Sequence, residues 1–160
     1  MIELVKGVFE QYRTNTRLYL SALEGISRED SLKQIHNRIN PIVYIAGHIV
    51  CVRFSAANLV GLKEEYKYNE ICKRGVELVD ASSCPSLDES INDWNEVSDK
   101  IFRRMGEISE EEFLAEPPGK FPSGDYTVRG GMVFLGSHDM YHIGQLIMLR
   151  KALGLKSPIG

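Results

Sequence analysis

Cysteine is scarce in this sequence, and charge is nowhere concentrated. The 160 residues include 3 cysteines, Cys51, Cys72 and Cys84. They form no CxxC pair, and an odd number is a poor basis for a disulfide framework. We therefore expect reduced thiols, which are usual in the cytoplasm. The chain carries 19 Lys and Arg against 22 Asp and Glu, a formal charge of -3, without a long block of one sign. It lacks the dense basic surface by which proteins bind nucleic acid, so we expect no such partner.

A long apolar run is also missing from the first twenty residues. The stretch MIELVKGVFEQYRTNTRLYL contains Glu3 and Glu10, so it resembles neither a signal peptide nor a membrane anchor. We expect a cytoplasmic protein with no membrane partner. No block of residues recurs at a fixed period, and no segment is of low complexity. The length suits a single domain over residues 1–160.

Apolar residues recur at spacings of three and four in the first half of the chain, which is typical of amphipathic helices. The first predicted helix covers residues 2–24. Its apolar stripe consists of Ile2, Val5, Phe9, Tyr12, Thr16, Tyr19 and Leu23. The second begins at Pro41, which suits the first position of a helix, and runs to Gly61 with Arg53 as its only formal charge. Its expected inward residues are Ile45, His48, Val52, Ser55 and Leu59.

Two further helices are predicted in the second half. The third starts at Ser86, because Glu89 three residues later completes a capping-box pattern. Its apolar stripe is Leu87, Ile91, Trp94, Val97, Ile101, Met105 and Ile108. The fourth covers residues 127–153 and ends before Gly154. We expect residues 61–86 to form a long surface connection, and the prolines and glycines of residues 109–126 forbid a continuous helix. Four long amphipathic segments without a strand series predict an all-α bundle.

The last predicted helix carries two histidines within its apolar stripe. This stripe passes through Val128, Leu135, His138, His142, Leu149 and either Ala152 or Leu153. Side chains four apart on a helix are neighbours, about 5 to 6 Å apart at Cβ. Each buried polar group without a partner would cost about 1 to 3 kcal/mol, and a divalent metal removes that penalty because neutral imidazole is a good ligand. His48, in the apolar second helix, is the candidate third ligand. The three would leave positions open on the ion, as in a reactive site.

Other interpretations of these polar residues stay open at the level of sequence. An HxxxH pair alone is a weak motif, and buried histidines can instead pair with carboxylates in a metal-free bundle. His36 lies in a polar stretch and is expected at the surface. Cys51 could approach the metal, although a small buried thiol is the simpler role. Asp139, Tyr141 and Gln145 could lie next to the site or could face solvent or other helices.

The last helix is also rich in glycine. Each glycine in a helix costs about 1 kcal/mol relative to alanine. They indicate close approach of a neighbouring helix, although the first two could instead mark an irregular first turn. The residues concerned are Gly130, Gly131, Gly136 and Gly144.

Two motifs together resemble a known family. The segments NPIVYIAGHIVCVRF and SHDMYHIGQLIMLRKALG are similar to the paired signatures of the DinB-like superfamily of metal-binding four-helix bundles. In that superfamily a histidine of the second bundle helix joins an HxxxH pair in the last helix, commonly followed by Gly-Gln. The resemblance assigns these roles to His48, His138 and His142, with Gly144 and Gln145 at the Gly-Gln position.

The resemblance implies a fold, a cofactor and a range of activities. It implies an up-down-down-up four-helix bundle with a long connection between the second and third helices, a divalent metal, usually zinc or nickel, and often a homodimer. Characterised relatives include transferases and isomerases that use the thiols bacillithiol or mycothiol. We therefore expect a metal-dependent enzyme that activates water or a low-molecular-weight thiol as an S-transferase does. A metal-dependent hydrolase and a noncatalytic, metal-stabilised, stress-associated binding module are the alternatives. Tyr44 and Phe54 stand where the family often has tryptophan, so the substrate preference of relatives does not carry over.

Overall fold

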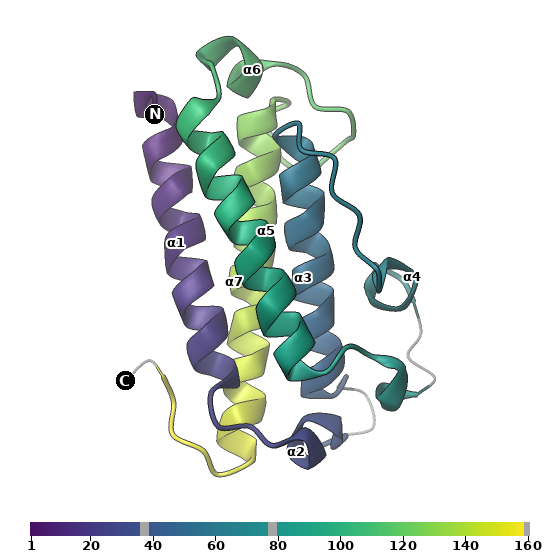
Figure 1. The fold of residues 1–160 in the computed structure, drawn as a ribbon. Helices are drawn as coiled ribbons and strands as arrows, with labels where there is room; N and C mark the ends of the chain where they lie inside the picture. Colours follow the sequence, from purple (N-terminus) through teal and green to yellow (C-terminus); the bar gives the residue numbers. More distant parts are fainter. Residues whose placement is uncertain (36–38, 77–79, 159–160) are drawn as a thin grey trace.

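Four long helices lie side by side in the computed structural model, which describes residues 1–35, 39–76 and 80–158 (Figure 1). They are α1 (Glu3–Leu23), α3 (Ile42–Leu59), α5 (Leu87–Glu107) and α7 (Val128–Ala152). Shorter helices stand in the connections: α2 (Arg28–Leu32), α4 (Asn69–Cys72), α6 (Glu110–Leu114) and a 3-10 turn at Ala81–Ser83. Every regular element within the described ranges is helical, so the all-α prediction is confirmed.

The boundaries of the long helices lie within a few residues of the predicted ones, and side-chain caps set the starts of α5 and α7. The Ser86 hydroxyl accepts a hydrogen bond from the amide of Glu89 at 3.2 Å, and the Glu89 carboxylate accepts one from the Ser86 amide at 2.9 Å. This capping box starts α5 as predicted. Thr127 caps α7 by accepting a hydrogen bond from the amide of Gly130. Pro41 stands at the N-cap of α3 rather than inside its first turn.

Helix α7 contacts both α1 and α3, and α5 also contacts α1 and α3. Gly136 shows how close the helices come, because a Cβ there would lie 3.0 Å from Cε2 of Tyr12 on α1. The predicted close approach is wrong for Gly144, where a Cβ would meet nothing within 4 Å. The up-down-down-up order of the helices stays a prediction from the family resemblance.

Among the described helices, α3 alone is long and apolar enough to cross a membrane by length and composition. In this structure 78% of it is buried, as expected for the core helix of a bundle. Its side chains are buried except for Val52 and Phe54, which are half-buried, and Ser55 and Asn58, which are exposed. The prediction that Ser55 faces inward is therefore wrong, because Ser55 is exposed. Its hydroxyl donates to the carbonyl of Cys51 in the preceding turn.

The sequence left open whether Ala152 or Leu153 ends the apolar stripe of the last helix. Ala152 is exposed and Leu153 is partly buried, so Leu153 is the better choice.

The connection between α3 and α5 is more than the surface loop that its composition predicts. Tyr66, Cys72 and Cys84 are at most 8% exposed, and their side chains belong to the core cluster around α3. The polar composition of this segment hides these anchors because they are separated by charged residues. As a result the connection packs along α3, from His48, which bonds to Cys72, to Phe54, which stacks on Tyr66.

Candidate metal centre

Three histidines meet at one point between α3 and α7. The candidate ligand atoms of His48, His138 and His142 all lie within 4.8 Å of one another. The ring centroids of His138 and His142 are 4.4 Å apart, and His48 lies 5.2 and 4.8 Å from them. His48 is 8% exposed, and the other two rings are half-buried. The predicted residues are therefore brought together by two adjacent helices.

The His48 ring is fixed by a backbone group of the α3–α5 connection. Its Nδ1 lies 2.7 Å from the carbonyl oxygen of Cys72. A carbonyl only accepts, so Nδ1 carries the proton and Nε2 keeps its lone pair for a ligand role. Gly47 makes this approach possible, because a Cβ there would lie 2.8 Å from Sγ of Cys72 and 3.0 Å from Cγ of Pro85. The sequence did not predict that Cys72 contacts His48. The glycine directly before His48 is a signal that another segment approaches α3 closely at this point, although it does not say which segment.

The His142 ring is fixed by its own helix. Its Nδ1 lies 2.7 Å from Oε1 of Gln145, one turn further along α7, so the amide oxygen accepts the ring proton and Nε2 is again left free. Gln145 thus lies next to the site, one of the roles that the sequence left open. The third ring differs, since Nδ1 of His138 is buried and has no hydrogen-bond partner among the described residues.

Burial keeps two of these rings neutral. It lowers the pKa of His138 to about 4, helped by the neighbouring His142 and His48 and by the positive charge of Arg74. Burial also lowers the pKa of His142, although the hydrogen bond to Gln145 opposes this shift. Both imidazoles are therefore neutral at pH 7, which is the form that binds metal ions.

These residues fit a divalent metal ion. Three imidazole nitrogens suit zinc or nickel and leave part of the coordination sphere to other ligands. Two nitrogens at about 2.1 Å from one tetrahedral ion lie about 3.4 Å apart, so ligand atoms separated by up to 4.8 Å have to move closer by about 1 Å to hold one. The buried, unpartnered Nδ1 of His138 is a polar atom that a nearby ion or its ligands would satisfy.

The remaining candidates divide between the site and the structure around it. Tyr141 is 64% exposed and presents its ring edge-on to His142 at 4.9 Å. Cys51 is a buried thiol that donates to Oδ1 of Asn69 at 3.3 Å, so it serves packing rather than the histidine cluster. His36 lies outside the described residues. A cavity of about 570 Å³ adjoins His48 and His142.

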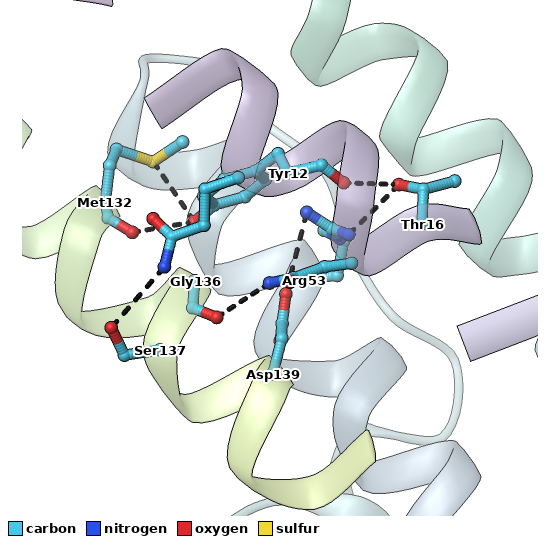
Figure 2. Close-up of polar contacts among 9 residues, drawn as sticks. Tyr12, Thr16, Arg53, Met132, Gly136, Ser137 and Asp139 are labelled. Atoms are coloured by element: carbon cyan, nitrogen blue, oxygen red, sulfur yellow. Dashed lines mark hydrogen bonds and ion pairs between the residues drawn. The ribbon is translucent and has the colours of Figure 1, made fainter. Parts of the chain in front are cut away.

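Asp139, directly after His138, forms a buried ion pair with Arg53 of α3 (Figure 2). The Arg53 Nη1 lies 3.5 Å from Oδ2 of Asp139, and the two side chains are 0% and 1% exposed. The guanidinium is held between the rings of Tyr12 and Trp94, at 4.5 and 3.8 Å from their centroids. Burial raises the pKa of Asp139, and the charge of Arg53 opposes this rise. The pair joins α3 to the turn of α7 that carries His138.

Fold and site together define an all-helical protein in which two adjacent helices gather three histidines that could hold a metal. The family model of the DinB superfamily matches residues 11–146. The chain therefore belongs to the DinB superfamily, as its two motifs predicted. The structure is similar to the crystal structure of a DinB-like protein from Bacillus cereus, with a TM-score of 0.70, 18% sequence identity, and coverage of 96% of this chain and 95% of that chain. At this identity the likeness concerns the fold. A comparison with curated proteins gave no match.

Proposed function

We propose that His48, His138 and His142 bind one divalent metal ion, zinc or nickel, and that the protein is a metal-dependent enzyme. Its nucleophile would be a water or a low-molecular-weight thiol. The observation that carries this proposal is the fixed tautomer of two rings, whose Nδ1 protons go to the Cys72 carbonyl and to Gln145 at 2.7 Å each. A bound ion would lower the pKa of a water or thiol at its open positions and so supply a nucleophile at neutral pH.

The chain's own residues would prepare the site for this chemistry. The Cys72 carbonyl and Gln145 each hold one ring in a single orientation, and such partners typically change metal affinity about 10- to 100-fold. The low pKa of His138 and His142 keeps protons from competing with the ion at neutral pH. Three ligands from the protein would leave room for the reacting molecule.

Metal titration tests the ligand set. Chelator-treated protein is titrated with Zn²⁺ or Ni²⁺ by calorimetry, and the metal content is measured by mass spectrometry. We expect one ion per chain in the wild type and large losses of affinity in His48→Ala, His138→Ala and His142→Ala. His36→Ala, which changes the fourth histidine, serves as the matched control. Equal binding by the three variants and the control would overturn the proposed site.

A second experiment separates the possible reactions. The metal-loaded protein is incubated with an electrophile in the presence and absence of a panel of thiols. Product that forms only with a thiol supports an S-transferase, and product that forms from water alone supports a hydrolase. No product under either condition, with metal still bound, would favour the noncatalytic, metal-stabilised module.

A further inference from the structure

The cavity beside the histidines has the size of a small-molecule site. Its volume is about 570 Å³, within the range of about 300 to 1,000 Å³ that is usual for such sites. Residues of α3 and α7 form most of its wall, and His48 and His142 lie on it. The other described lining residues are Ile39, Asn40, Tyr44, Ile45, Tyr141, Gly144, Gln145, Met148 and Leu149.

None of the described lining residues is acidic or is a lysine or arginine. Two of the polar groups already have partners, since the Tyr44 hydroxyl donates to the carbonyl of Val76 at 3.1 Å and Gln145 accepts from His142. Arg74, whose charge acts on His138, is not part of the wall. Without a metal ion, a carboxylate or ammonium group against the apolar part of this wall would lose hydration without gaining an opposite charge from the described lining residues, which is unfavourable.

We propose that this cavity binds an uncharged organic molecule, with its apolar body against Ile45, Met148 and Leu149 and one small donor group directed at the histidine cluster. The role of the donor group rests on the proposed function, because a metal ion would be its partner. The apolar wall exists independently of the ion. The proposal deepens the proposed function by naming the substrate class: an apolar thiol or alcohol fits the wall, whereas a carboxylate on the part of the molecule that contacts Ile45, Met148 and Leu149 does not.

Gly144 makes the proposal open to a clean test. It lies on the cavity wall, and a Cβ at this position would meet no atom within 4 Å. A larger side chain can therefore enter the cavity without disturbing the packing of the helices.

The test uses two probes of equal size, 1-naphthalenemethanol and 1-naphthoate. Their affinities for the full-length protein are measured by NMR titration, with and without zinc. Without zinc, we expect the alcohol to bind at least tenfold more tightly than the carboxylate, which a bound zinc ion would itself attract. Gly144→Leu should weaken binding of the alcohol at least tenfold while zinc binding persists. Met148→Lys should strengthen naphthoate binding by up to about fivefold, the usual range for a partly exposed charge pair. Met140→Lys, on the same helix but outside the cavity, should change neither affinity.

The outcomes separate this inference from the proposed function. Binding of the alcohol without zinc, abolished by Gly144→Leu, supports the apolar site even if the protein proves unable to hold a metal. Naphthoate binding as tight as the alcohol in the zinc-free wild type, or equal effects of Met148→Lys and Met140→Lys, would overturn the inference while metal titration still supports the proposed function. A tighter complex of 1-naphthalenemethanethiol with zinc than without it would support the orientation of the donor group, and equal affinities would refute it.

Discussion

Replacing Asp139 by asparagine should destabilise the protein by about 3 to 5 kcal/mol, the cost of leaving one charge of a buried ion pair uncompensated. The Arg53 guanidinium and the Asp139 carboxylate are fully buried and 3.5 Å apart. At this distance, with an effective dielectric constant of about 20, their attraction amounts to about 5 kcal/mol. The amide keeps the shape of the carboxylate but cannot neutralise Arg53, so the cost appears as lost stability.

Urea unfolding measures this loss. Trp94 is the only tryptophan and its ring lies 3.8 Å from the Arg53 guanidinium, so its fluorescence reports on this region. With an m-value of about 2 kcal/mol per molar urea, the midpoint should fall by about 1.5 to 2.5 M. The measurement belongs at pH 8, because burial raises the pKa of Asp139 and only the ionised carboxylate neutralises Arg53. A loss below about 1 kcal/mol would refute the reasoning, since it is the value expected of a solvated pair.

A double-mutant cycle isolates the pair from the surrounding packing. Arg53→Met alone should also be destabilising, because it leaves the carboxylate of Asp139 buried without its partner. Adding Asp139→Leu to Arg53→Met should recover much of that loss, since apolar replacements of whole buried pairs are often neutral or stabilising. Losses that simply add in the double variant would show that the two side chains do not interact.

Three other predictions follow from particular contacts. Gly144→Ala should stabilise the protein by about 0.5 to 1 kcal/mol and raise its melting temperature. Gly130→Ala should lower the melting temperature, because a Cβ there would lie 1.9 Å from a backbone oxygen. A higher melting temperature for Gly130→Ala than for Gly144→Ala would contradict the packing. Burial raises the pKa of the Cys72 thiol to about 12, so the rate of its alkylation at pH 8 should increase strongly on unfolding, and mass spectrometry can follow this residue. The hydrogen bond from Tyr68 holds the pKa of Glu89 at about 2, below its usual 4.5. The ionised Glu89 therefore adds at most about 1 kcal/mol to the free energy of unfolding. This stabilisation should be lost as the pH falls from 4.5 towards 2. Thermal melts of Glu89→Gln, in which this loss is absent, check the effect.

Sequence alone determined the helices and the residues of the candidate centre. Periodicity predicted four long helices, and the capping-box pattern at Ser86 located the start of the third, because these signals act within one or two turns of the chain. The same periodicity placed His48, His138 and His142 on inward faces, and the DinB motifs joined them into one set. The metal, the thiol or water nucleophile and the homodimer remain predictions.

Only the tertiary structure decided which distant groups meet. The hydrogen bond from His48 to the carbonyl of Cys72 depends on how a polar connection folds back on α3, and backbone carbonyls carry no residue-specific signal. The pairing of Arg53 with Asp139 and the cavity beside His142 depend on the register of α3 against α7. That register results from close packing summed over many side chains, so it cannot be inferred from the local spacing of residues within either helix.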